Sequence, residues 1–409
     1  MPDAKTDPRS LETAEWTPAP CDLCGSQSTL KLGERQYTVR GRTTDFAMVI
    51  EDAACALCGF VFAARRPDSN FLMAYYRDAH IGHRGGELHF DGPARLATVA
   101  QRTPKGGRII EIGANDGAFC KALSEDGFDA FGFDPVEADE ADGVGKGFMG
   151  DGSSEIAAPQ SADTVVAFYV LEHVIDANAW LAEALGLLKD GGTLILEVPN
   201  YATHPGDSLN PEHLLHFTPR TLRELLVRHG LEPEDAGATT PTVRYGQAVA
   251  ARLIDRTKVQ RPAAPDDTYY KEGQAALREA QHAYKIARAE RTARTLAAHA
   301  AATLAQEADP TGKASAFVWG ANEYAERAAP LLVEHFADVR VVDKSASKID
   351  TPFPGLDAPI AHPDTAAQAD TRIFLLCSPN WNAQIAKEIA DAGWDALAVI
   401  DAVTGEVLA

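Results

Sequence analysis

The chain has 409 residues, of which 45% are hydrophobic and 24% are charged. This balance is typical of a globular protein that buries real cores, and the length predicts two or three domains. Lys and Arg total 38 against 59 Asp and Glu, which leaves a formal net charge of −21. Such an acidic chain repels polyanions at long range, so we expect no nucleic-acid partner.

The sequence also argues against a membrane protein. No stretch approaches the roughly 18 consecutive apolar residues of a membrane-spanning helix. The first residues, MPDAKTDPRS, lack the apolar core of a secretory signal. Six cysteines in the whole chain are too few for a disulfide scaffold. We therefore expect a cytoplasmic protein in a reducing environment, with no membrane partner.

Four of the six cysteines form two C-x-x-C pairs near the start of the chain. Each pair is followed directly by a glycine, Gly25 or Gly59, and 30 residues separate the two pairs. Two such pairs suit one tetrahedral Zn²⁺ with four sulfur ligands and no open coordination position, which predicts a structural metal. Two redox pairs or buried thiols are the alternatives. The predicted ligands are Cys21, Cys24, Cys55 and Cys58.

The segment between the pairs alternates like the strands of a small ribbon. It lacks a concentrated basic stripe with interleaved aromatic residues, as a nucleic-acid-binding ribbon would have. We therefore expect a zinc-binding domain over residues 16–80 that covers a larger unit.

The larger unit begins near residue 100 with an apolar strand, a glycine-rich turn and a helix. The turn, Glu111–Gly117, has the pattern E-x-G-x-x-x-G, in which glycines let the backbone approach a ligand and the following helix offers free N–H groups. A second apolar strand ends in Asp134, where a carboxylate can bind ribose hydroxyls. The expected cofactor-binding residues of this region are Glu111, Gly113, Asn115, Gly117 and Asp134.

Two further segments complete the pattern. The run ADTVVAFYVLEHVID is an apolar strand that leads into Glu172 and His173. The run LAEALGLLKDGGTLILEVPN predicts a helix, a Lys-Asp-Gly-Gly turn over 189–192 and another strand.

Together, EIGANDG, GFDP, VLEHVID and LKDGGTLILEVPN resemble the motifs of class I S-adenosylmethionine-dependent methyltransferases in order and spacing. The resemblance implies a Rossmann-like domain that binds S-adenosyl-L-methionine. We assign this domain to residues 81–260. Around the end of its fourth strand we expect Phe168, Tyr169 and Leu171 to line the adenine and the transferred methyl group, and Tyr76 to close over the methionine end.

The last third of the chain also has an α/β pattern. An alanine-rich segment with interspersed Lys and Arg predicts a solvated helical linker over 261–308. Strand, glycine turn and helix then recur over 309–409, which predicts a C-terminal α/β Rossmann-like domain. A four-cysteine module, a methyltransferase domain and such a third domain together resemble the sugar C-methyltransferase family.

That resemblance implies the substrate and the reaction. Members of the family methylate a carbon of a nucleotide-linked keto-deoxysugar, after a base removes a proton beside the ketone to give an enolate. The resemblance assigns proton removal to a Tyr-x-Glu-His run and to a histidine after the fourth strand. Here the matching residues are Glu212, His213 and His173, while Asn210 stands at the tyrosine position. A histidine near its ordinary pKa of about 6.5 suits proton transfer at neutral pH.

Each catalytic candidate also has a structural interpretation. His173 and His213 can serve packing or loop geometry, Glu212 can cap the helix that starts near Thr218, and Tyr75 and Tyr76 can be a core pair. His216 is expected to pack or face solvent.

Other functions remain open at this stage. An O- or N-methyltransferase would use the same scaffold with a base for a hydroxyl or amine. A NAD-dependent oxidoreductase would use a similar loop and acid, although the G-x-G-x-x-G spacing is missing. A zinc-ribbon adaptor without enzymatic activity is the third alternative.

Overall fold

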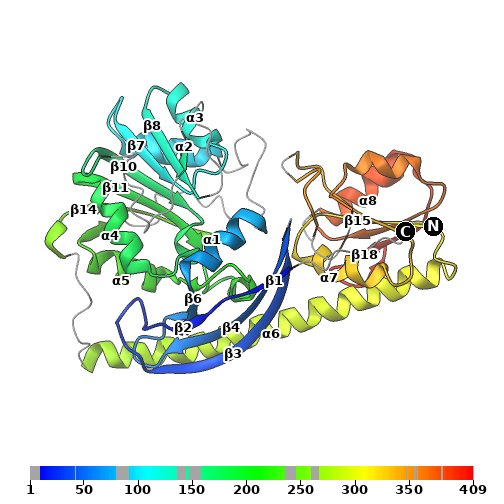
Figure 1. Cartoon of the computed structure of the whole chain (residues 1–409), viewed down its shortest axis with the longest axis horizontal. Coiled ribbons are helices and arrows are strands. Elements are labelled where there is room, and N and C mark those ends of the chain that lie inside the picture. The colour runs from blue at the N-terminus through cyan, green and yellow to red at the C-terminus, as the bar shows by residue number, and fades with distance from the viewer. Residues whose placement is uncertain are drawn as a thin grey trace.

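The structure, a computed structural model, describes residues 10–41, 43–79, 92–135, 144–146, 158–234, 246–258, 267–346, 348–353, 356, 358–378 and 381–408. Figure 1 shows a blue β-rich N-terminal unit below a large central sheet, and a separate C-terminal sheet with its own helices. One long helix, α6, runs beneath the N-terminal unit and on to the C-terminal one. None of the helices in the described ranges is both long enough and apolar enough to cross a membrane.

The N-terminal unit is built around a hairpin of two long antiparallel strands. Its elements are β1 (Ser10–Thr13), β2 (Trp16–Pro18), β3 (Thr29–Arg40), β4 (Thr44–Cys55), β5 (Val61–Ala63), β6 (Arg65–Pro67) and α1 (Ser69–Asp78). Its sheet has the order β1-β4-β5-β12, with β3 paired to β4. The strand β12 (Leu215–His216) comes from the central domain, so the two units share backbone hydrogen bonds.

The central sheet has seven strands in the order β13-β14-β11-β10-β7-β8-β9. The strand β14 is antiparallel to both of its neighbours. The elements are α2 (Gly92–Arg102), β7 (Arg108–Ile112), α3 (Ala118–Glu125), β8 (Asp129–Asp134), β9 (Val144–Lys146), β10 (Ala162–Phe168), η3 (Leu171–His173), α4 (Ala177–Leu187), β11 (Leu188–Pro199), η4 (Pro205–Leu209), α5 (Pro219–Arg228), β13 (Leu231–Pro233), β14 (Gly246–Leu253) and η6 (Arg256–Lys258).

This topology determines where a ligand can bind. The strands β7, β8 and β10 are parallel, so their carboxyl ends meet at one edge of the sheet. The antiparallel β14 between β11 and β13 distinguishes the sheet from the six-stranded order of dinucleotide-binding folds, which disfavours the oxidoreductase alternative. The expected Lys-Asp-Gly-Gly turn over 189–192 falls within the bounds of β11, but the pairing with β10 passes directly from Leu188 to Thr193 and Gly191 has φ +76°, so the segment is an irregular insertion in the strand.

The helix α6 (Asp267–Ala308) is 42 residues long, so the predicted helix is present, and most of its described positions are exposed or half-buried while one face is buried. Small residues on one face of the helix are buried against the rest of the chain. They include Gly273, Ala287 and Ala301. Because alanine and glycine project so little, the helix approaches other backbones closely. Its Tyr284 donates a hydrogen bond of 2.9 Å to the buried Asp52 of β4.

The C-terminal sheet has the order β16-β15-β17-β18-β19, in which only β19 is antiparallel to its neighbour. Apolar clusters cover both faces, one facing α6 and α7 and the other facing α8. The elements are β15 (Ser315–Trp319), α7 (Glu323–Leu332), β16 (Asp338–Val342), η7 (Pro363–Gln368), β17 (Arg372–Leu376), α8 (Asn382–Asp391), β18 (Ala396–Asp401) and β19 (Glu406–Val407).

Candidate active site and cysteine cluster

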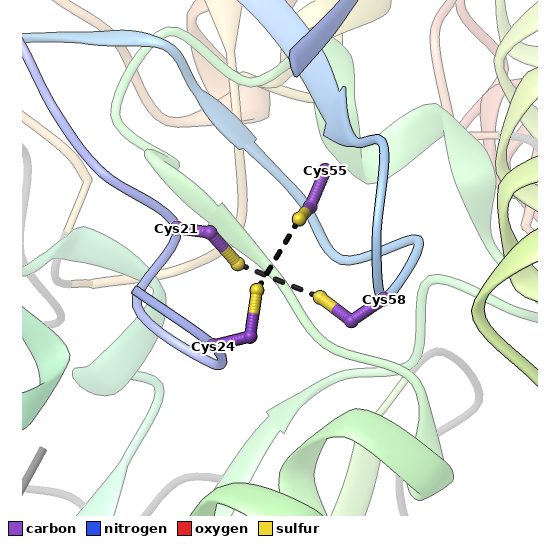
Figure 2. A group of neighbouring side chains, drawn as sticks. All are labelled: Cys21, Cys24, Cys55 and Cys58. Carbon is purple, nitrogen blue, oxygen red and sulfur yellow. Dashed lines mark hydrogen bonds between the residues drawn. The ribbon is translucent and has the colours of Figure 1, made fainter. Parts of the chain in front are cut away.

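The four cysteines of the two pairs meet in space. Figure 2 shows their sulfur atoms pointing toward one centre. The Sγ atoms of Cys21 and Cys58 are 3.5 Å apart, those of Cys24 and Cys55 are 3.4 Å apart, and all four lie within 4.8 Å of one another. Zinc–sulfur bonds of about 2.3 Å in a tetrahedron place sulfurs about 3.8 Å apart. The four thiols therefore have the number, chemistry and spacing that a tetrahedral metal ion requires.

The backbone around each pair is tightly turned. The amide of Gly25 donates to the carbonyl of Cys21 at 2.7 Å, and that of Gly59 donates to Cys55 at 2.9 Å. Both glycines have φ near +70°, a conformation that other residues rarely adopt. A Cβ added at Gly59 would also lie 2.6 Å from the backbone of Ala276 in α6. The second pair is therefore packed directly on the long helix.

The cysteine cluster is also joined to the central domain. Asp22, inside the first pair, forms a buried ion pair of 2.7 Å with Arg66. Its other carboxylate oxygen accepts from the amide of Ala177, the first residue of α4. On the opposite side, Arg220 of α5 donates to the carbonyl of Cys58 at 2.6 Å. These contacts orient the N-terminal unit against the central domain.

The glycine-rich loop after β7 has the shape expected of a ligand-binding turn. Gly113, Asn115 and Gly117 all have positive φ, at +78°, +47° and +78°. The amide of Asn115 donates at 3.0 Å to a carboxylate oxygen of Asp134, at the end of β8. The sequence-predicted residues of the loop and of the second strand are thus brought together at one edge of the sheet.

Glu111 precedes this loop and is buried. Its carboxylate accepts a hydrogen bond of 3.1 Å from the Cys120 thiol. Burial raises the pKa of Glu111 to about 7. A Cβ on Gly113 would lie 2.5 Å from Cγ2 of Val170, so this glycine also allows close packing of the loop against the end of β10.

The three hydrophobic residues expected around the end of β10 have different surroundings. Phe168 packs edge-on against Phe119 and beneath the guanidinium of Arg95, whose centre is 4.6 Å from the ring. Tyr169 has φ +58°, and its amide donates to the carbonyl of Glu197. Leu171 is 1% exposed and belongs to the main core.

The catalytic candidates converge beyond β10. The two tyrosines of α1 reach them: the Tyr75 hydroxyl donates to Oε1 of Glu212 at 2.8 Å, and the Tyr76 hydroxyl lies 3.0 Å from Nδ1 of His173. That same Nδ1 is 4.0 Å from Oε2 of Glu212. The rings of His173 and His213 meet edge to face, with centroids 4.6 Å apart. Tyr76, expected at the cofactor, thus contacts a catalytic candidate, and Tyr75 supplies a phenol beside Glu212.

His213 is held by a residue that the sequence analysis did not single out. Its Nδ1 is 2.6 Å from one carboxylate oxygen of Asp207 in η4, and the other oxygen lies 3.0 Å from Nδ1 of His216. Burial alone would lower the pKa of His213, but the Asp207 carboxylate raises it to about 9. The expectation of an ordinary histidine pKa is therefore wrong here, because a buried carboxylate favours the imidazolium.

Asn210 connects the two catalytic candidates of this loop. Its Oδ1 accepts from the Glu212 amide at 3.0 Å, and its Nδ2 lies 3.1 Å from Nε2 of His213. Its position is thus used for loop geometry. The cap of α5 is the Thr218 side chain, so the interpretation of Glu212 as that cap is wrong.

Glu172 is the second residue missed by sequence analysis. It is 0% exposed, and neither of its carboxylate oxygens has a hydrogen-bond partner within the described part of the chain. Burial raises its pKa to about 8. Its position directly before His173 was visible in the sequence, but its burial was not.

The C-terminal domain also reaches the candidate site. Burial and the Glu212 carboxylate raise the pKa of Tyr75, and Glu326 of α7 contributes to the same shift through its charge. The Arg294 guanidinium of α6 lies 4.9 Å from the ring centre of Tyr324, also in α7. The start of α7 therefore lies on the side of the molecule where Tyr75 and Glu212 meet.

Comparison with known proteins agrees with this geometry. Residues 82–236 match the family model described as a methyltransferase domain. A probable S-adenosylmethionine-dependent methyltransferase of Mycolicibacterium smegmatis is 32% identical over 120 residues, which cover 27% of this chain and 47% of that protein. A ubiquinone biosynthesis O-methyltransferase of Azorhizobium caulinodans is 33% identical over 138 residues, covering 31% of this chain and 50% of that one.

The chain thus spans about half the length of the curated relatives it matches. Among solved structures, a SAM-dependent methyltransferase from Archaeoglobus fulgidus is similar over 45% of this chain and 100% of its own, with 19% identity and a TM-score of 0.34. Residues 82–236 contain the loop after β7, the ends of β8 and β10, and the candidates His173, Glu212 and His213, whereas Tyr75 and Tyr76 of α1 lie before them. Over residues 82–236 the chain is therefore similar to methyltransferase domains, including that of a probable S-adenosylmethionine-dependent methyltransferase.

Proposed function

We propose that the protein transfers a methyl group from S-adenosyl-L-methionine to a carbon of a nucleotide-linked keto-deoxysugar. The observation that carries this proposal is the convergence of Glu212 and Tyr75 with His173 at the edge of the sheet where the cofactor loop lies. A carboxylate fixed by a phenol and faced by an imidazole suits removal of a weakly acidic proton from carbon.

The cofactor-binding part of the proposal rests on the loop after β7. Gly113 and Gly117 keep the backbone open to a ligand, and Asp134 at the end of β8 takes ribose hydroxyls. The bound cofactor supplies an electrophilic methyl group. The protein's task is to align the acceptor with it and to remove a proton.

In the proposed reaction, Glu212 takes the proton beside the substrate ketone. The electron pair of the broken C–H bond then makes the carbon nucleophilic and places charge on the ketone oxygen. Tyr75 holds the carboxylate in position through its 2.8 Å hydrogen bond. His173 and His213 face the same space and favour negative charge on the oxygen.

Zinc has a structural role in this proposal. Cys21, Cys24, Cys55 and Cys58 hold one Zn²⁺, and the four thiolates leave it no open position for catalysis. The ion would stabilise the turns that carry Asp22 and the contact of Cys58 with Arg220. The position of α1 and its two tyrosines then depends on this folded N-terminal unit.

The C-terminal domain would border the acceptor. The charge of Glu326 reaches Tyr75, so a substrate at Glu212 would lie next to α7. A nucleotide-sugar bound at Glu212 would extend toward this domain. Methyl transfer to oxygen or nitrogen is the second candidate, supported by the named function of the O-methyltransferase relative and by Asn210 at the tyrosine position of the C-methyltransferase run.

The test is product analysis. Purified protein is incubated with isotope-labelled S-adenosylmethionine and candidate nucleotide-ketosugars, and the site of the label is identified by mass spectrometry and NMR. A separate reaction without cofactor follows exchange of the carbon-bound proton with deuterated water, because enolisation can precede methylation. We expect exchange in the wild type and its loss in Glu212→Gln. Label on oxygen or nitrogen, without proton exchange, would establish the second candidate instead.

A further inference from the structure

A buried carboxyl group beside the catalytic candidates lacks a hydrogen-bond partner within the described part of the chain. Glu172 is fully buried, and among the described residues no donor reaches either of its oxygens. Ionising such a group without a partner costs several kcal/mol, so buried carboxylates are usually paired or bound to metal. The His173 imidazole is close, with its Nε2 3.9 Å from Oε1 of Glu172.

Two imidazoles face this carboxylate in fixed orientations. Ligand atoms of Glu172, His173 and His213 all lie within 4.8 Å of one another. Atoms bound to one metal ion at about 2.1 Å are roughly 3 to 4 Å apart, so a small contraction would complete the geometry. One carboxylate and two imidazoles are the donor set of many divalent transition-metal sites.

The outer contacts are those that a metal site uses. Asp207 lies 2.6 Å from Nδ1 of His213, and the Tyr76 hydroxyl lies 3.0 Å from Nδ1 of His173. Metal-binding histidines usually have their second nitrogen held in this way, which orients the ring. Nε2 of His213 is the nitrogen that Asp207 leaves available, and a metal ion bound there would replace its 3.1 Å contact with Nδ2 of Asn210 and the proton of the imidazolium.

Acidic side chains outnumber the histidines around this site. Three carboxylates, from Glu172, Asp207 and Glu212, surround the two imidazoles. Arg95 of α2 is paired with Glu197 of β11 at 2.7 Å. We propose that Glu172, His173 and His213 bind a divalent transition-metal cation, distinct from the ion of the cysteine cluster, which accepts an oxygen of the methyl acceptor as a further ligand.

This inference extends the proposed function. Only one part of it depends on that function, namely the acceptor oxygen that the metal ion would bind. A cation here would act as a Lewis acid on the acceptor oxygen, while Glu212, which is outside the ligand set, remains the base. Metal binding itself needs neither the acceptor nor turnover, so the two proposals can fail separately.

The experiment measures Mn²⁺ binding by electron paramagnetic resonance, which detects the free ion. The full chain is first treated with a chelator under conditions in which elemental analysis shows that the cysteine-bound metal is retained. We expect one Mn²⁺ per chain, with Glu172→Gln weakening binding by about 100-fold or more and Asp207→Asn by about 10- to 100-fold. His173→Gln is the second ligand variant.

The matched control is Glu212→Gln, a neighbouring carboxylate that should lose methyl transfer yet keep wild-type Mn²⁺ affinity. Cys55→Ser should likewise keep the Mn²⁺ site wherever the protein stays folded. Melting temperature and S-adenosylmethionine binding show whether each variant is folded. Absence of Mn²⁺ binding in the wild type, or unchanged affinity in folded Glu172→Gln and His173→Gln, would overturn the proposal.

Discussion

The hydroxyl of Tyr75 donates a 2.8 Å hydrogen bond to the carboxylate of Glu212, across 137 positions of the chain. Tyr75 lies in α1, outside the strands and loops of the methyltransferase domain, and it is 3% exposed. The phenol that the family resemblance places two residues before Glu212 is therefore absent there but present in space. The N-terminal unit supplies part of the candidate site.

Replacing Tyr75 with Phe removes this hydroxyl and keeps the ring that packs against Phe46. We expect turnover to fall about 10- to 100-fold, the scale of one hydrogen bond to a charged group. Affinity for S-adenosylmethionine should be unchanged. Steady-state kinetics and calorimetry check both statements, with Tyr37→Phe, in β3, as the control. Equal turnover in Tyr75→Phe and the wild type would remove this hydroxyl from the mechanism.

Glu111 should make stability depend on pH. Burial raises its pKa from the ordinary 4.5 to about 7. The folded state therefore holds the proton more tightly than the unfolded chain, so this contribution is fully present below about pH 4.5 and is lost as pH rises through about 7. Glu111→Gln does not titrate, and its free energy of unfolding should gain about 3 kcal/mol relative to the wild type across that range.

Denaturant unfolding at a series of pH values measures this difference. Glu125→Gln, which changes an exposed carboxylate at the end of α3, is the control and should follow the wild type. Parallel curves for Glu111→Gln and the wild type would show that Glu111 titrates normally.

The cysteine cluster predicts a metal-dependent fold. Purified protein should contain about one zinc per chain, and Cys55→Ser should lose it together with thermal stability. The control is Cys377→Ser, because Cys377 is equally buried but lies in the C-terminal sheet region away from the cluster. Elemental analysis and melting curves report the outcome, and full zinc content in Cys55→Ser would contradict the assignment.

Two helical glycines should respond oppositely to alanine. A Cβ at Gly273 of α6 would collide with the carbonyl of Leu57 in the second cysteine pair, whereas a Cβ at Gly186 of α4 has no neighbour within 4 Å. Gly186→Ala should be neutral or stabilising by about 0.5–1 kcal/mol, the difference in helix propensity. Gly273→Ala should lower the melting temperature and increase the reactivity of the cysteines toward thiol reagents. A stabilised Gly273→Ala would mean that α6 does not pack as described.

Sequence reasoning could identify the local units of the central domain. Apolar runs that end at Gly113, at Asp134 and before Glu172 correspond to β7, β8 and β10, because periodicity and glycine placement are local properties. The approach of the four cysteines also follows from their spacing. The Lys-Asp-Gly-Gly segment interrupts the pairing of β11 with β10, as its glycine-rich composition predicts, although the strand begins one residue before it.

The polar contacts of the candidate site could not be read in the same way. Asp207 and Glu172 belong to the candidate site because they are buried and lie close to His213. Both properties depend on the tertiary fold and cannot be predicted from the neighbouring residues in the sequence. The packing of α6 was missed for a related reason. Its alanines read as a solvated helix, yet they are small enough to lie directly against the turn at Gly59.

The length and straight course of α6 set a constraint on insertions and deletions. The helix contacts the second cysteine pair near Gly273, the loop of η4 at Gly206 and the C-terminal sheet near Ala301, all within one continuous stretch. One added residue rotates everything after it by about 100° and shifts it by about 1.5 Å. The C-terminal domain would then face away from Tyr75. Insertions or deletions of about seven residues, close to two full turns, would nearly restore the orientation of the C-terminal domain. Natural length variation in α6 should therefore come in steps of about seven residues.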